Sequence, residues 1–176
     1  MIPGTLFQHR WAIRIVAAIA EQQGSRFTVL KHQLGVSADS LSTSLSRLIE
    51  QGWIEKNPGY GHPLRPEYIL STAGHSISAD CVTFVHTTQQ WHAVVYRRWS
   101  TSALVAIQNG ASRFGEIQNQ IQAVTPRALA LGLRNLAGVN LIEREAEDRL
   151  PQRAEYMLTR TGRTVARVAR PLVLIG

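Results

Sequence analysis

Small hydroxyl side chains cover one face of residues 37–48, a stretch that has the spacing of an α-helix. Leu41, Leu45 and Leu48 recur at i, i+4 and i+7 and form one apolar stripe, whereas most other positions are Ser or Thr. Ser and Thr are mediocre helix formers, so a face that meets only water would more readily carry Glu, Lys, Gln or Ala. Their hydroxyls donate hydrogen bonds to phosphates and base edges. The pattern therefore predicts a helix that lies against nucleic acid.

The same pattern returns 88 positions later, where Thr125 takes the place of Ser37 and three leucines again follow in register. Thr125 as a capping hydroxyl and Pro126 at the first helical position are strong signals for the start of a helix. Further landmarks recur at the same shift: Trp11 and Trp99, Pro63 and Pro151, Glu67-Tyr68 and Glu155-Tyr156, Gly74 and Gly162. Repetition at a fixed shift indicates an internal duplication, and so two modules of roughly 85 residues each.

Hydrophobic periodicity and turn residues predict the same order of elements in both modules. In the first, helices are expected at 7–22, 28–34 and 37–51, strands at 53–56 and 67–70, and a further helix from Thr72. In the second, helices are expected at 92–108, 115–121 and 125–138, strands at 141–144 and 155–158, and a last helix between Thr159 and Pro171. Two helices around a tight turn, followed by a β-hairpin, form a winged helix-turn-helix.

The predicted fold class is thus mainly α with small β-hairpins (α+β), as two tandem winged helix-turn-helix domains joined by a helical linker. We expect the first domain at 1–76, the linker and the start of the second module at 77–98, and the second domain at 99–176. The linker is expected to break near Thr87-Thr88. The apolar tail Leu172–Ile175 is expected either to pack against the core or to pack on a partner chain.

These motifs resemble the HxlR-type regulators within the broad MarR-like group. The shared features are a Trp in the first helix, an Arg-Phe pair before the second, a capping Ser or Thr before the third, and a Tyr-x-Leu-Ser/Thr-x-x-Gly closure. The closures here are residues 68–74 and 156–162, and the Arg-Phe pairs are Arg26-Phe27 and Arg113-Phe114. The resemblance implies a bacterial-type, DNA-binding transcription regulator. Family members usually carry one module and dimerise, so two modules in one chain imply either an intramolecular pseudo-dimer or a homodimer.

The outward positions of the two predicted recognition helices, 37–51 and 125–138, are the main candidates for contact with double-stranded DNA. Arginine reads guanine, Asn135 could pair with adenine, and Leu131 could meet a thymine methyl group. Alternatively, the arginines are solvated residues of an amphipathic helix. With two residues of the first hairpin, the candidate DNA-binding residues are Ser37, Ser40, Thr43, Ser46, Arg47, Tyr60, Arg65, Thr125, Arg127, Arg134 and Asn135.

The two hairpins differ in charge. The loop of the first has no acid and carries Tyr60 and Arg65, which suits a phosphate backbone or a minor groove. The second carries four carboxylates: Glu143, Glu145, Glu147 and Asp148. Because phosphates repel carboxylates, this hairpin is expected to turn away from DNA or to bind a protein partner. The two modules should therefore read unlike sequences.

The net charge of +7 is unevenly placed: residues 1–80 hold seven Lys/Arg and six Asp/Glu, for +1, whereas 81–176 hold twelve and six, for +6. A basic surplus favours a polyanionic partner. No apolar run approaches the roughly 18 residues of a membrane span, and the first residues lack the pattern of a signal peptide. One cysteine, Cys81, fits a reducing compartment. We expect a cytoplasmic protein without contact to a membrane.

No residue pattern indicates catalysis, a cofactor or a metal site. The six histidines lack the spacing of paired ligands, and Cys81, His86 and His92 match no zinc pattern. Neither a Gly-rich phosphate loop nor a nucleophile elbow is present in the sequence. Cys81 is expected to be a buried, inert thiol. These observations favour a binding protein over an enzyme.

The sequence thus predicts a sequence-specific binder of double-stranded DNA that regulates transcription. Two alternatives stay open. Tandem winged helices also serve as protein-interaction scaffolds, and the acidic second hairpin suits that role. A DNA binder for replication, partition or plasmid transfer would use the same docking chemistry as a transcription regulator.

Overall fold

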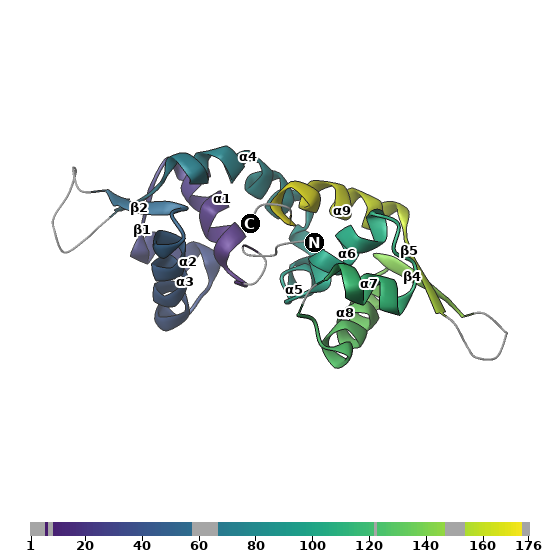
Figure 1. The fold of residues 1–176 in the computed structure, drawn as a ribbon. Helices are drawn as coiled ribbons and strands as arrows, with labels where there is room; N and C mark the ends of the chain where they lie inside the picture. The colour runs from purple at the N-terminus through teal and green to yellow at the C-terminus, as the bar shows by residue number, and fades with distance from the viewer. Residues whose placement is uncertain (1–5, 7–8, 58–66, 122, 147–153, 174–176) are drawn as a thin grey trace. The chain divides into compact units, whose positions relative to one another are not determined.

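The chain forms two compact units, in a computed structural model that describes Leu6 and residues 9–57, 67–121, 123–146 and 154–173. One unit, called the first module below, covers residues 11–86; the other, the second module, covers residues 87–176 together with 1–10. Each has the element order of a winged helix-turn-helix (Figure 1). The predicted mainly α class with small hairpins and two tandem modules is confirmed.

The first module places two helix-turn-helix helices beside a small sheet. Its elements are α1 (Ala12–Gln22), β1 (Ser25–Arg26), α2 (Phe27–Leu34), α3 (Ala38–Glu50), β2 (Ile54–Asn57), β3 (Glu67–Leu70) and α4 (Thr72–Thr87). Strand β3 lies between β1 and β2 and is antiparallel to both, with Ser25 opposite Tyr68 and Ile54 opposite Leu70. The apolar stripe of α1 is buried and α1 contacts both α2 and α3. This core fixes the position of α3.

The second module repeats this plan with a two-stranded sheet. Its elements are η1 (Gln89–Trp91), α5 (His92–Val95), α6 (Ser100–Gln108), α7 (Phe114–Gln120), α8 (Pro126–Gly138), β4 (Ile142–Ala146), β5 (Ala154–Leu158) and α9 (Arg160–Val173). Strands β4 and β5 are antiparallel, with Ile142 opposite Leu158, and a single bridge from Arg113 to Glu155 stands where the first module has β1. Helix α6 packs on α8 and α9. It therefore occupies the centre of this module.

In the first module, Ser71 and Gly74 attach the end of the hairpin to the turn that precedes it. The Ser71 hydroxyl donates to the carbonyl of Gly52 and accepts from the backbone N–H of Gly74 at 3.0 Å. A Cβ at Gly74 would collide with the carbonyl oxygen of Trp53. The closure therefore needs both a hydroxyl and a residue without a side chain.

The second module has the same attachment. The Thr159 hydroxyl donates to the carbonyl of Asn140 at 2.9 Å and accepts from the backbone N–H of Gly162 at 2.9 Å. A Cβ at Gly162 would collide with the carbonyl oxygen of Leu141. The Ser/Thr-x-x-Gly sequence is therefore repeated because each module needs the same close approach of backbone to backbone.

The prediction of a single helix over 92–108 is wrong, because the helix is interrupted between α5 and α6. Trp99 adopts a left-handed backbone with φ 75°, which is unusual for a large side chain. The buried Thr101 hydroxyl donates to the carbonyl of Val95 at 2.6 Å and so stabilises the break. The sequence carries no sign of it, since neither Gly nor Pro lies in this stretch.

Two smaller expectations also differ from the structure. Helix α1 begins at Ala12 rather than at residue 7. Helix α9 continues past Pro171 as far as Val173. Pro171 removes one backbone donor, but Leu172 and Val173 are fully buried, and their burial favours the added residues.

None of the helices in the part of the chain that the structure describes is long and apolar enough to cross a membrane.

Candidate nucleic-acid interface

Helix α3 is held from one side and exposed on the other. Leu41, Leu45 and Leu48 are almost wholly buried, as their spacing predicted. The Ser37 hydroxyl caps the helix by accepting from the backbone N–H of Ser40 at 3.3 Å. A capping hydroxyl of this kind typically contributes about 1 kcal/mol to stability. The helix thus has a fixed start and a fixed rotation about its axis.

The outer face of α3 carries the predicted contact residues. Ser40, Thr43, Ser46 and Arg47 are all exposed. Ser44 differs: it is only 8% exposed, and its hydroxyl donates to the carbonyl of Ser40 at 2.7 Å. The Ser44 hydroxyl therefore serves the helix itself, whereas Thr43 and Ser46 lie on its exposed face.

Helix α8 has the same cap and the same buried leucine stripe as α3, but it exposes different side chains. Thr125 is its cap, accepting from the backbone N–H of Ala128 at 3.3 Å. Arg127 and Arg134 are exposed, Asn135 is half-buried, and Leu131 is 51% exposed. No described carboxylate forms an ion pair with either arginine. Two uncompensated guanidinium groups thus flank an exposed leucine.

A cleft of about 340 Å³ runs along one flank of α8 and brings further basic residues to it. The predicted contact residues Thr125 and Asn135 line this cleft together with Leu131. The opposite wall is the break between α5 and α6, with Arg97 and Arg98. Both arginines are exposed. The surface around α8 therefore carries four arginines, of which the sequence analysis identified two.

The left-handed backbone of Trp99 places these two arginines beside α8. The guanidinium carbon of Arg98 lies 4.6 Å from the centre of the Trp99 ring, within the range of a cation–π contact. Arg97 donates from Nε to the carbonyl of Ala93 at 3.0 Å. Both side chains are thus partly held in place. The basic dipeptide is visible in the sequence, but its position depends on a break that the sequence does not announce.

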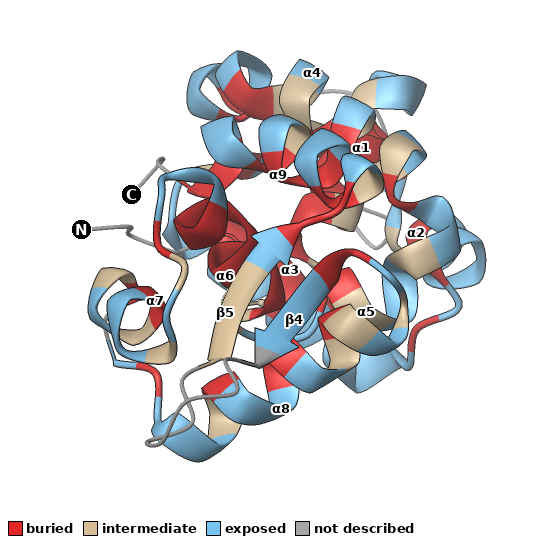
Figure 2. Cartoon of the chain, turned by 90° about the vertical axis from the view of Figure 1, so that its right-hand side faces the viewer, coloured by how far each residue is buried: buried red, intermediate tan, exposed pale blue. Residues whose placement is uncertain are grey.

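The hairpins lie mainly outside the described residues. Tyr60 and Arg65 of the first hairpin are among the residues that the structure does not describe, as are Glu147 and Asp148 of the second. Glu143 and Glu145 on β4 are exposed, and Figure 2 shows β4 as mostly exposed beside the half-buried β5. The described part of the second hairpin therefore exposes two carboxylates and, between them, the guanidinium of Arg144.

A comparison with protein families decides the class of the chain. The family described as HxlR-like helix-turn-helix matches residues 6–94 and again residues 94–174. The chain belongs to this family. The two matches together cover both modules, in agreement with the duplication.

Several relatives of this HxlR-like chain are named as regulators. An uncharacterised HTH-type transcriptional regulator of Methanothermobacter thermautotrophicus is 38% identical over 68 residues, which are 39% of this chain and 52% of the relative. The regulator YybR of Bacillus subtilis is 32% identical over 81 residues, 46% of this chain and 62% of the relative. The chain thus spans between half and two thirds of the length of these relatives. The solved structure of a putative regulator, ytfH from Salmonella typhimurium, is 28% identical with a TM-score of 0.43, covering 48% of this chain and 76% of that one.

The cysteine of the HxlR-like chain lies inside the first module. Cys81 on α4 is fully buried, and burial, with a smaller contribution from Asp80, raises the pKa of its thiol to about 12. The thiol is therefore protonated at neutral pH, whereas the thiolate is the reactive form. Among the described residues, no group of three His, Cys, Asp or Glu side chains is placed to hold a metal ion.

The first helix of the second helix-turn-helix carries a feature that the sequence analysis missed. The Glu116 carboxylate accepts from the backbone N–H groups of Ser112 at 2.9 Å and Arg113 at 3.0 Å. These hydrogen bonds lower the pKa of Glu116. Arg113 in turn pairs with Glu155 on β5, with Nε and Oε1 3.5 Å apart. Glu116 thus caps the start of α7 by hydrogen bonds to the preceding backbone, and Arg113 links this start to the hairpin.

Proposed function

We propose that this chain binds double-stranded DNA in a sequence-specific manner and regulates transcription. Helices α3 and α8 would enter major grooves, and the proposal concerns binding alone, without a catalytic step. Its support is the family, whose relatives are named as HTH-type transcriptional regulators, and the surface of α8. The observation that carries it is the exposure of Arg127 and Arg134 beside an exposed Leu131.

The chemistry of α8 matches base recognition. A guanidinium can donate two hydrogen bonds to the O6 and N7 atoms of guanine, and an exposed leucine can pack on a thymine methyl group. A single exposed leucine is ordinary on a protein surface, so the two arginines beside it carry the argument. Arg97 and Arg98 on the far wall of the cleft would contact phosphates and so fix the register of α8.

The contacts of the first module would be weaker and of a different kind. Thr43 and Ser46 offer neutral hydrogen bonds, and Arg47 offers a charged one. Tyr60 and Arg65 of the first hairpin would add contacts to the backbone. Because α3 and α8 carry unlike side chains, one chain acting as a pseudo-dimer would read two unlike half-sites. Their centres would be about 10–11 base pairs apart if both helices bind.

The decisive experiment selects genomic fragments with the purified full chain and sequences those that are retained. A shared asymmetric motif is the expected result, with two dissimilar halves. A palindromic motif would instead indicate a homodimer in which one module of each chain reads DNA. Retention of fragments without a shared motif would indicate that the chain binds DNA without sequence specificity.

Affinity should fall steeply with salt, because phosphate contacts release counterions. Neutralising roughly 4–8 phosphates gives a slope of log K against log salt of about −4 to −7. The slope is measured by titrating a labelled fragment at several salt concentrations.

The exposed Glu143 and Glu145 favour one competing function, a scaffold that binds a protein through the second hairpin. No retention of any duplex at low salt, or a flat salt response, would support that function and contradict DNA binding.

A further inference from the structure

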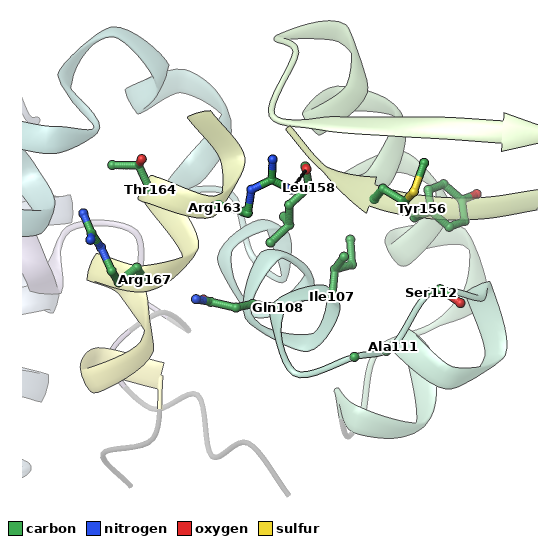
Figure 3. Close-up of a pocket in the computed structure, with 11 residues that line it drawn as sticks. Ile107, Gln108, Ala111, Ser112, Tyr156, Leu158, Arg163, Thr164 and Arg167 are labelled. Atoms are coloured by element: carbon green, nitrogen blue, oxygen red, sulfur yellow. Dashed lines mark hydrogen bonds between the residues drawn. The ribbon is translucent and has the colours of Figure 1, made fainter. Parts of the chain in front are cut away.

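A second cavity of the second module lies away from the residues assigned to DNA. Its volume is about 520 Å³, within the range of about 300–1,000 Å³ that is usual for small-molecule sites. It is open to solvent and is lined by the end of α6 and the residues that follow it, by β5 and by α9 (Figure 3). All of its walls belong to one compact unit. The cavity is therefore a property of the second module by itself.

One side of this cavity is apolar. Ile107 at the end of α6 and Leu158 at the end of β5 are each 8% exposed, and Ala111 is 3% exposed. The half-buried Tyr156 adds an aromatic ring from β5. A ring or short chain packed here would remove apolar surface from water on both sides of the contact.

The other side is positively charged. Arg163 and Arg167 are one helical turn apart on α9, so they share a face, and Gln108 of α6 adds an amide. Arg163 donates from one terminal nitrogen to the carbonyl of Leu158 at 2.9 Å, which anchors the guanidinium at the edge of the apolar side. No described residue forms an ion pair with either arginine, and α9 contains four arginines and no acid.

The duplicated module provides an internal comparison. At the shift of 88 residues, Arg163 and Arg167 correspond to His75 and Ala79 of α4, while Leu158 and Tyr156 correspond to Leu70 and Tyr68. The apolar strand residues are thus retained, and the two arginines belong to the second module alone. The closure of the hairpin does not need them, because the first module closes without them.

We propose that this cavity binds a small amphipathic organic anion. Its apolar part would pack on Ile107, Leu158 and Tyr156, and its carboxylate or sulfonate would accept hydrogen bonds from Arg167 and from the remaining donors of Arg163. A guanidinium fork suits planar oxyanions of this kind. The site does not depend on the proposed DNA binding, since none of the residues assigned to DNA lines it.

The test uses the full chain without DNA and 8-anilinonaphthalene-1-sulfonate, a fluorescent anion with apolar rings. The native protein should bind it saturably at one site. Arg167→Gln should weaken binding about tenfold, the loss expected for one charge-assisted hydrogen bond. Gln108→Trp, which places a large ring from an exposed position into the cavity, should abolish binding. Thermal unfolding of each variant confirms that it is folded.

Arg160→Gln is the matched control, because it removes the same charge from the same helix outside the cavity. It should change the affinity by less than about twofold, as expected for a distant screened charge. The uncharged probe N-phenyl-1-naphthylamine should bind more weakly than the sulfonate and respond less to Arg167→Gln. Equal losses in Arg160→Gln and Arg167→Gln, or unchanged binding in Gln108→Trp, would overturn the proposal. Either result leaves the DNA experiments unaffected, so the two proposals fail separately.

Discussion

Ser71 in the first module and Thr159 in the second form the same pair of hydrogen bonds, and each is followed by a glycine at the same distance. Both glycines lie against a backbone carbonyl that leaves no room for a Cβ. The caps Ser37 and Thr125 are equally alike. At these positions the two copies have stayed the same because the backbone geometry allows few other residues.

The surfaces of the two modules have diverged. Where α3 exposes Thr43 and Ser46, α8 exposes Leu131 and Arg134. Trp11 has an ordinary backbone with φ −103°, whereas its counterpart Trp99 is left-handed. The comparison teaches that the fold constrains few side chains in a module of this size. The exposed faces were free to change, and their differences therefore report on what each module binds.

The largest effect should follow from filling the space at the shared glycines. Gly74→Ala and Gly162→Ala should each lower the free energy of unfolding by about 2–4 kcal/mol, because a backbone carbonyl cannot move aside as a flexible side chain can. Urea unfolding followed by circular dichroism measures the loss. Gly115→Ala, where an added Cβ meets nothing within 4 Å, is the control and should change stability by less than about 1 kcal/mol. A large loss of stability for only one of the two glycine variants would mean that the two modules do not share this closure.

The next effect separates the recognition helices. Replacing Arg127 and Arg134 together by Ala should cost about 1–3 kcal/mol per residue at the cognate site and remove protection over one half of the footprint. Replacing Thr43 and Ser46 together by Ala should cost less, about 0.5–1.5 kcal/mol per lost neutral hydrogen bond, and affect the other half. Footprinting of both double variants decides. Equal loss on the two sides of a palindrome would show that α8 of two chains reads the site.

A smaller and less selective effect is expected at the break before α6. Arg97→Gln with Arg98→Gln should weaken binding to cognate and random DNA alike and lower the salt slope by roughly 1–2, one for each lost phosphate contact. The control, Arg160→Gln with Arg170→Gln, removes two exposed charges of the same module away from α8. If both pairs lower the slope equally, net charge rather than the cleft accounts for the effect.

The sequence predicted the parts of the fold that depend on local chemistry. The helix expected at 125–138 agrees with α8 and its cap Thr125, because a hydroxyl cap and a proline mark its start and a regular leucine stripe marks its buried face. The two strands of each hairpin were also placed to within about two residues. The exposure of the candidate residues on α3 and α8 followed from the same stripes, except for Asn135, which is half-buried.

What could not be predicted depends on contacts between distant residues. The break at Trp99 rests on Thr101 bonding to Val95 inside the module, and no local breaker marks it. The pairing of Ser25 with Tyr68, which makes β1, joins residues far apart in sequence. The position of Arg97 and Arg98 beside α8 follows from that break, so it depends on tertiary contacts and could not be predicted from the local sequence.

The smallest expected effect concerns the first helix of each helix-turn-helix. Glu116 accepts two backbone hydrogen bonds at the start of α7. When the pairs Arg26-Phe27 and Arg113-Phe114 are aligned, a shift of 87, its counterpart in α2 is Val29, which is exposed and has no side-chain acceptor. The pKa of Glu116 is lowered in the folded chain, chiefly by the bonds from Ser112 and Arg113. A carboxylate with a lowered pKa contributes stability above its unfolded pKa and loses it as the pH falls through the folded value. Glu116→Gln should therefore melt below the native chain at pH 7, and the difference should vanish once the native carboxylate is protonated in acid. Glu143→Gln, which removes an exposed carboxylate from β4, controls for charge alone. Thermal melts of the three proteins across this pH range measure the effect, and a difference that persisted in acid would mean that the ionised carboxylate is not what holds the start of α7.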